Sequence, residues 1–242
     1  MTPIMTPPMT PAVGGQSSKN VDIVFCIDGT GSMSPCIDNV KNNALRFRQE
    51  LVSELLALGN TINALRVKVI TFRDYEKDGA ESMVESRFFE LENDDEQVEY
   101  SNYISEITAK GGGDLPENGL EALYLAMKSD WTQGNKDRQV IVLFTDADAL
   151  ELGERAGCAG YPADMVDMAG FQETWACVQG RETNLIPRCK RLVVFAPAGT
   201  KYAELSKMLD RCTFEPVNPA AGLADIDFSA IIKTVAASVS SR

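Results

Sequence analysis

The chain has 242 residues, of which 44% are hydrophobic, and this suits one α/β domain with a single large core better than two full domains. Acidic residues outnumber basic ones by 35 to 23, so the net charge of −12 repels phosphate backbones and anionic lipid, and we expect neither nucleic acid nor a membrane surface as a partner. The absence of histidine excludes Ser-His-Asp and Cys-His catalysis and His-ligated zinc.

Residues 1–19 carry a repeated Met-Thr-Pro pattern without a basic leader or a long apolar run. We therefore expect an extended or unfolded arm, not a secretory signal, followed by one domain over residues 20–242. No stretch approaches the roughly 20 apolar residues that a membrane span requires. Of the six cysteines, Cys26 falls in an expected buried strand and Cys36 in the first turn of a helix. A chain of this size does not depend on disulfides, so we expect a reducing, cytoplasmic compartment.

The segment from Val21 to Ser34 organises the rest of the chain. Its first seven residues are a nearly continuous apolar run, typical of a strand buried on both faces in a parallel sheet. Directly afterwards Asp28, Thr30 and Ser32 alternate with glycines, so three oxygen-bearing side chains can converge on one point. Carboxylate and hydroxyl oxygens are ligands that Mg²⁺ or Mn²⁺ accepts while keeping some of its waters. The segment therefore predicts an open cation site.

The next elements follow from hydrophobic periodicity. Apolar residues at steps of three and four predict a helix from the N-cap Ser34 through Leu58. A second strand is expected over 65–72, and an edge strand near 88–91. A helix follows, with the apolar residues Val98, Tyr103, Ile104 and Ile107.

The second half begins with three consecutive glycines, residues 111–113, which precede a helix over about 120–127. Asp114 in this connection has two open interpretations, a cation ligand or an N-cap with Glu117 as its capping-box partner. A second fully apolar strand, 140–144, runs into Thr145 and Asp146.

The remaining chain contains an expected insertion at about 150–187 with one short helix. Strands are expected over 192–195 and 212–217, and a helix after each, the first capped by Thr200. Strands that alternate with helices predict a doubly wound, mostly parallel central sheet flanked by helices, as in Rossmann-like folds.

Ligands bind such sheets beyond the carboxyl ends of the strands, where neighbouring loops meet. We therefore predict one divalent cation, Mg²⁺ or alternatively Mn²⁺ or Ca²⁺, because the carboxylates at this edge would otherwise repel one another. The candidate ligands come from three loops and are Asp28, Thr30, Ser32, Asp114 and Asp146. Each also has a structural interpretation, since the hydroxyls can bond amides at a helix start and Asp146 can order its own turn. Asp74 and Asp148 are interpreted as ordinary loop acids, and Tyr75 as packing.

The motif Asp28-Gly29-Thr30-Gly31-Ser32, with the Gly113-Asp114 loop and Phe144-Thr145-Asp146, resembles the von Willebrand factor type A domain and its metal-ion-dependent adhesion site over about residues 20–239. The resemblance implies that Thr30 and Ser32 bind the metal directly and that Asp28 and Asp146 act directly or through water. Thr30 replaces the family's usual Ser, and Asp114 stands where a Thr is common.

The strings Arg73-Asp74-Tyr75 and Gly111-Gly112-Gly113-Asp114-Leu115-Pro116-Glu117 are similar to the intracellular branch of that family, which includes domains attached to alpha-kinases. Membership implies a non-enzymatic scaffold or recognition module, in which an Asp or Glu of a protein partner completes the coordination of the metal. Two alternatives are weaker. A Mg-dependent haloacid-dehalogenase-like phosphatase would need an aspartate nucleophile where this chain has Cys26. A cysteine-zinc module would need close Cys-x-x-Cys pairs, which the chain lacks.

Overall fold

The computed structural model describes residues 18–112, 116–217 and 228–241. Seven strands form one sheet in the order β3-β2-β1-β5-β6-β7, and β4 pairs with β2 outside this path. The strands are β1 (Ser18–Asp28), β2 (Thr61–Phe72), β3 (Met83–Glu85), β4 (Phe89–Glu90), β5 (Arg138–Phe144), β6 (Lys190–Pro197) and β7 (Cys212–Val217). The five longest strands are parallel and only β3 and β4 run antiparallel to β2, so the predicted doubly wound, mostly parallel sheet is confirmed.

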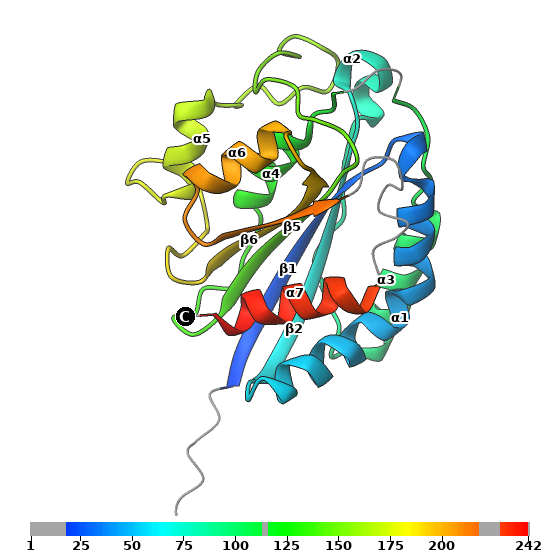
Figure 1. The fold of residues 1–242 in the computed structure, drawn as a ribbon, viewed down its shortest axis with the longest axis vertical. Coiled ribbons are helices and arrows are strands. Elements are labelled where there is room, and N and C mark those ends of the chain that lie inside the picture. The colour runs from blue at the N-terminus through cyan, green and yellow to red at the C-terminus, as the bar shows by residue number, and fades with distance from the viewer. Residues whose placement is uncertain (1–17, 113–115, 218–227, 242) are drawn as a thin grey trace, which may run out of the picture.

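Helices cover both faces of this sheet (Figure 1). The helices are α1 (Ser34–Ala57), α2 (Tyr75–Asp78), α3 (Asp94–Glu106), α4 (Gly119–Met127), α5 (Met168–Trp175), α6 (Lys201–Met208) and α7 (Phe228–Ser240), with 3-10 turns η1 (Gly31–Met33) and η2 (Gly79–Glu81). The layer with α1, α3 and α7 lies on one face, and the layer with α4, α5 and α6 lies on the other. In the part of the chain that the structure describes, no helix combines the length and apolarity needed to span a membrane.

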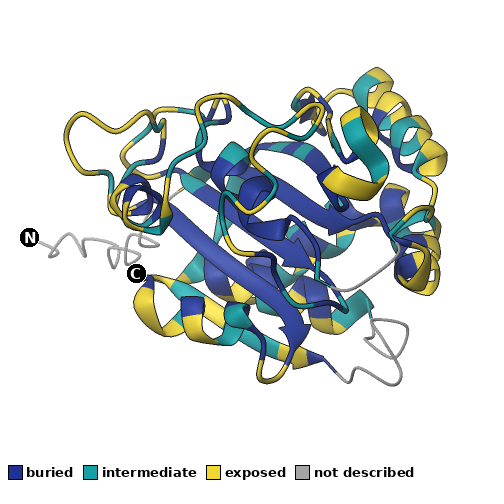
Figure 2. Ribbon diagram, turned by 90° about the horizontal axis from the view of Figure 1, so that it is seen from above, coloured by how far each residue is buried: buried dark blue, intermediate teal, exposed yellow. Residues whose placement is uncertain are grey.

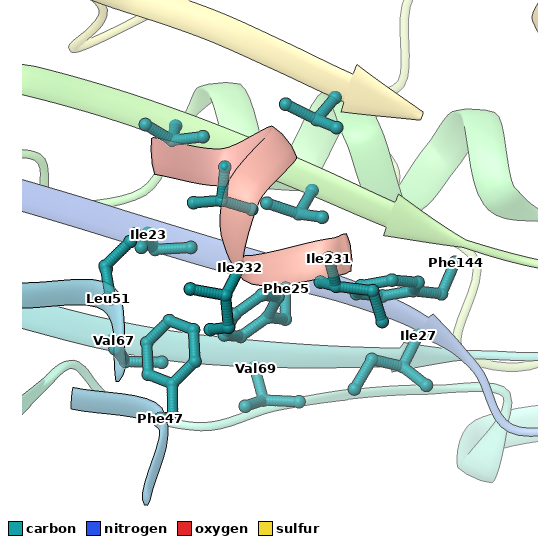
Figure 3. Close-up of a cluster of buried hydrophobic side chains, with 14 of the residues drawn as sticks. Ile23, Phe25, Ile27, Phe47, Leu51, Val67, Val69, Phe144, Ile231 and Ile232 are labelled. Carbon is teal, nitrogen blue, oxygen red and sulfur yellow. The ribbon is translucent and has the colours of Figure 1, made fainter. Parts of the chain in front are cut away.

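The apolar run of β1 divides between the two layers. Ile23, Phe25 and Ile27 point toward α1 and α7 and pack with residues such as Phe47 (Figure 3), whereas Val24 and Cys26 belong to the cluster beneath α4. Both faces of this central strand are therefore buried, as Figure 2 shows for the middle of the sheet. This explains why the sequence of β1 is continuously apolar and does not alternate.

Several predicted details of the helices are wrong. Ser34 is the first residue of α1 and not its N-cap, because η1 leads into the helix and Met33 takes the cap position. Leu58 lies just beyond the end of α1 and is 51% exposed, and Val98 on α3 is 56% exposed. The predicted Ile104 is buried on the inward face of α3, together with Tyr100, which lies four residues earlier and was not predicted.

The predicted arm over residues 1–19 lies outside the described residues apart from Ser18 and Lys19, which begin β1 and pair with β2. The strand predicted over 212–217 is confirmed with the same ends as β7. The strands predicted near 88–91, 140–144 and 192–195 are present with shifted ends, while β3 had no sequence-based prediction.

The segment over residues 150–187 contains α5, the one short helix expected there. Arg155 attaches this segment to α2, since its Nε and a terminal nitrogen donate to Asp74 at 2.7 and 3.0 Å. Asp74 also caps α2 by accepting from Glu76 N at 2.9 Å and is 1% exposed, so its interpretation as an ordinary loop acid was wrong. Tyr75 packs edge-on against Tyr161 at 5.1 Å between ring centres, as its interpretation as a packing residue implied.

Candidate metal centre

The centre lies at the carboxyl ends of β1 and β5, which are parallel neighbours. Asp28 is the last residue of β1, and Thr145 directly follows β5. The register that pairs Ile27 with Phe144 brings these two residues side by side. Asp28 is fully buried, and its Oδ2 accepts a hydrogen bond from the Thr145 hydroxyl at 2.7 Å. The carboxylate of Asp28, which was predicted from the loop after β1, is therefore held in place by the residue that follows β5.

A continuous series of short contacts connects the first loop with Asp146. The Oδ1 atom of Asp28 accepts from the Thr30 amide at 2.9 Å and from the Thr30 hydroxyl at 2.7 Å. The Oγ atoms of Thr30 and Ser32 are 3.3 Å apart, and Ser32 donates to Asp146 Oδ1 at 3.1 Å. Four of the five predicted ligands thus lie together, with Asp28 buried beneath and the Ser32 hydroxyl at the exposed surface.

The fifth candidate, Asp114, lies outside the described residues. Its alternative interpretation as the N-cap of the following helix is wrong, because α4 begins only at Gly119 and has Asn118 at its N-cap. The intervening Glu117 is not helical but forms an isolated parallel bridge with Ala149. Glu117 therefore cannot be the N3 member of a capping box.

Glu117 is a candidate residue that the sequence analysis assigned to the wrong role. It is 1% exposed, and its Oε2 atom has no hydrogen-bond partner among the described residues. Its Oε1 and the side chain of Thr30 both lie against Gly112, where an added Cβ would come within 3.1 Å of Oε1 and 2.6 Å of the Thr30 methyl carbon. A buried carboxylate oxygen with no donor is costly unless something else satisfies it.

Burial and neighbouring negative charge raise the pKa values of Asp28 and Glu117. Burial raises the pKa of Asp28 to about 6, although hydrogen bonds from Thr30 and Thr145 favour its anion, and the charge of Asp146 adds to the rise. Burial, and then the charges of Asp28 and other nearby acids, raise the pKa of Glu117 to about 8. Within the described residues, no Lys or Arg forms an ion pair with these three acids. No basic side chain among residues 18–112, 116–217 and 228–241 is therefore paired with this concentration of negative charge.

Arg73 holds the first loop against the glycine-rich connection. It directly follows β2, is 4% exposed, and donates from Nε to Gly29 O at 2.9 Å and to Lys110 O at 2.8 Å. Its terminal nitrogens donate to Glu81 O at 2.9 Å and to Thr108 O at 3.1 Å. The spacing of Arg73 in the sequence gives no sign of this role, because all four acceptors are backbone carbonyls.

The available donors fit a hard divalent cation. They are carboxylate and hydroxyl oxygens, the type that Mg²⁺, Mn²⁺ and Ca²⁺ prefer, and the orphaned Glu117 oxygen lies beside Thr30. Among the described residues, no group of three or more Cys, Asp or Glu gathers tightly enough to hold a metal on its own. An ion at this edge would therefore depend on the Thr30 and Ser32 hydroxyls as well as on carboxylates.

Cys26 points away from this centre, which argues against phosphatase chemistry. Its side chain belongs to the cluster on the α4 side of the sheet, and its thiol contacts Ala122 O at 3.7 Å. Burial raises the pKa of the Cys26 thiol well above its usual value, so this residue is a buried thiol and not a nucleophile.

Comparisons with known proteins agree with the geometry. A family model described as the von Willebrand factor type A domain matches residues 23–149, about half of the chain. The alpha-protein kinase vwkA of Dictyostelium discoideum is 28% identical over 126 residues, which are 52% of this chain and 18% of that protein. The chain thus spans less than a fifth of this curated relative.

Among solved structures, the pilus adhesin SpaC from Lactobacillus rhamnosus GG superposes with a TM-score of 0.53 at 15% identity, over 93% of this chain and 31% of the adhesin. The open conformation of the same adhesin gives a TM-score of 0.52 at 13% identity, over 93% of this chain and 30% of the adhesin. At these identities the likeness concerns the fold alone.

Proposed function

The chain belongs to the von Willebrand factor type A domain family, and on this premise we propose that it is a non-enzymatic protein-binding module with a metal-ion-dependent adhesion site. The observation that carries the proposal is the cluster at the ends of β1 and β5, where Asp28, Thr30, Ser32 and Asp146 are connected by contacts of 2.7 to 3.3 Å. The orphaned Glu117 oxygen beside them supports the same conclusion.

In this proposal Thr30 and Ser32 hold a divalent cation directly, with Mg²⁺ as the expected ion and Mn²⁺ or Ca²⁺ as alternatives. Asp28 and Asp146 hold it directly or through water, and Asp114 and Glu117 are further candidates from the connection before α4. The bound cation supplies a positive charge and an open coordination position. Thr145 keeps Asp28 oriented through the 2.7 Å hydrogen bond to its Oδ2.

The proposed partner is a folded protein that inserts an Asp or Glu at the open position. Several acids already surround the site, so a lone carboxylate is expected to bind modestly and the surrounding surface to supply most of the affinity. Replacing Asp114 by Thr removes one negative charge and keeps an oxygen. We expect Asp114→Thr to strengthen binding of a carboxylate ligand, and unchanged or weaker binding would contradict this electrostatic argument.

The likeness to a protein named alpha-protein kinase vwkA supports an assignment to the branch attached to alpha-kinases. We propose on this basis a cytoplasmic scaffold or recognition role, which agrees with Cys26 and Cys36 being free thiols on opposite sides of the sheet. No phosphatase activity is proposed, because Cys26 occupies the position that an aspartate nucleophile would need.

The test is affinity capture with the immobilised full chain in Mg²⁺, in excess chelator, and with Ser32→Ala in Mg²⁺. Ser34→Ala is the matched control, since Ser34 is exposed at the start of α1 and its contact with Gly31 O comes from the backbone amide, which alanine keeps. We expect partners that bind the wild type and Ser34→Ala in Mg²⁺ and are lost both with chelator and with Ser32→Ala. Mutating one acidic residue of such a partner should reproduce the loss. A partner that binds equally well in chelator does not dock at this centre.

A further inference from the structure

The short helix α2 lies at the same edge of the sheet as the metal centre. Asp28 at the end of β1 is in register with Phe72 at the end of β2, and α2 begins soon afterwards at Tyr75. Loops of the 150–187 segment lie next to it (Figure 1). None of the four residues of α2 is a candidate metal ligand, so any effect of this helix on a metal must pass through other residues.

One end of α2 holds the glycine-rich connection. Asp78, the last residue of the helix, accepts a hydrogen bond from Gly112 N at 3.2 Å. Its carboxylate also lies against Gly111, where an added Cβ would come within 1.9 Å of Oδ1. Gly111 O accepts from Gly31 N at 3.4 Å, and Gly112 lies against the Thr30 side chain. Asp78 is therefore linked through two glycines to the first loop of the centre.

The other end of α2 is fastened by the 150–187 segment. Arg155 donates two hydrogen bonds, at 2.7 and 3.0 Å, to Asp74, which caps α2. The Asp74 side chain is 1% exposed, so removal of Arg155 would leave a buried carboxylate without its paired cation. The ring contact between Tyr75 and Tyr161 adds packing to the same attachment. The position of α2 therefore depends on a segment that is distant from it in the sequence.

The same segment also contacts the connection before α4. Glu117 N donates to Asp148 O at 3.0 Å, and Leu150 N donates to Glu117 O at 2.9 Å. The Tyr161 hydroxyl donates to Oε1 of the buried Glu121 at 3.0 Å. Together with the contacts of α2, these bonds form one connected network of the kind that carries energetic coupling between separate groups.

We propose that the 150–187 segment regulates the metal centre by setting the position of α2. This inference rests on the proposed metal-binding function. When Arg155 is paired with Asp74, α2 is fixed and Asp78 holds the glycine-rich connection against the first loop. When the pair is broken, α2 moves, the connection loosens, and the oxygens around Thr30 lose their alignment. Arg155 and Asp78 are therefore positioning residues, and a molecule that displaces Arg155 lowers metal affinity without touching the metal.

The test compares two arginines that make the same kind of ion pair. Arg66 donates two hydrogen bonds to Asp22, at 2.9 and 2.7 Å. The side chains of Asp22 and Asp74 are both 1% exposed, and those of their arginine partners are 19% and 18% exposed. Asp22 lies six residues before Asp28 on β1, about 20 Å along the strand from the centre. Arg66→Met is therefore the matched control for Arg155→Met, with the same chemistry and burial at a distant position.

The first measurement is hydrogen exchange at the amides of Gly31 and Gly112 in the full chain without metal. We expect both amides to exchange about tenfold faster in Arg155→Met than in wild type, because the opening of the connection becomes easier. In Arg66→Met they should exchange close to the wild-type rate. Equal exchange in the two variants overturns the proposal, and this result does not depend on whether the chain binds a metal.

The second measurement is calorimetric titration of Mg²⁺ into the chelator-stripped full-length variants. Mg²⁺ should bind about tenfold more weakly to Arg155→Met and to Asp78→Ala than to Arg66→Met. Asp78→Asn keeps a side-chain acceptor for Gly112 N, so it should restore most of the affinity and separate the hydrogen bond from the charge. Equal Mg²⁺ affinities of Arg155→Met and Arg66→Met overturn the regulation alone. Absence of Mg²⁺ binding by the wild type overturns the proposed metal centre and the regulation with it.

Discussion

Arg73 offers a quantitative test of how the candidate metal centre is built. The substitution Arg73→Met keeps most of the aliphatic side chain but removes the guanidinium that donates to the four carbonyls of Gly29, Glu81, Thr108 and Lys110. At a net value of about 1 kcal/mol for each hydrogen bond, the loss is about 4 kcal/mol. This is a large part of the roughly 5–15 kcal/mol that stabilises a typical domain. The variant should therefore fold, but its unfolding midpoint should lie at a much lower urea concentration.

The assay is equilibrium unfolding in urea followed by circular dichroism, with Arg87→Met as the control. Arg87 is an exposed arginine whose ion pairs with Glu96 and Glu99 lie at the surface, so its removal should cost less than about 1 kcal/mol. The same loosening of the first loop should weaken metal binding in Arg73→Met. If the two variants unfold at the same urea concentration, Arg73 does not hold the loops together as we infer.

Three further predictions concern other parts of the molecule. Gly112→Ala should lose stability and metal affinity, because φ is +66° and the new methyl group would overlap the side chain of Thr30. The control Gly180→Ala has a φ of +94° but open space around it, so it should lower the free energy of unfolding in urea by only about 1–2 kcal/mol. Burial raises the pKa of Asp74, but the hydrogen bonds from Arg155 and from the Glu76 amide, together with nearby positive charge, outweigh it and lower the pKa below 3.8. The ionised Asp74 carboxylate should therefore contribute fully to the free energy of unfolding above about pH 4 and less at lower pH. The unfolding free energies of wild type and Asp74→Asn should converge in acid. A constant difference between them from pH 7 to 3 would refute the role of the ion pair. Cys26 and Cys36 should be alkylated as free thiols in unfolded protein without reductant, as mass spectrometry can check, and either one in a disulfide would point to an oxidising compartment.

The central strands could be predicted because their environment leaves a simple pattern. Helices cover both faces of β1 and β5, so nearly every residue is apolar and the strands are obvious in the sequence. Exposure at element ends depends on tertiary contacts, and for this reason Leu58 and Val98 were assigned to buried faces although both are exposed. The strand β3 has three partly exposed residues and no periodicity, and it forms because β2 offers a free edge.

The candidate site could be predicted where its residues share one loop or follow a buried strand. The alternation of Asp28, Thr30 and Ser32 and the position of Asp146 after β5 are local signals, and the structure brings these four together. Glu117 has no comparable signal, because its place near Thr30 depends on tertiary contacts, in which Gly112 lies against both side chains. Its spacing from Asp114 suggested a cap, and only the late start of α4 removes that interpretation.

The most direct test of the account is calorimetric titration of Mg²⁺ into the chelator-stripped full chain and into Asp28→Ala. Asp28 accepts hydrogen bonds from Thr30 and Thr145 and lies at the base of the cluster, so its carboxylate is central to the proposed centre. We predict one binding site in the wild type and none in Asp28→Ala, with both proteins giving the same circular dichroism spectrum. Equal Mg²⁺ binding by the two folded proteins would contradict the assignment of the metal centre.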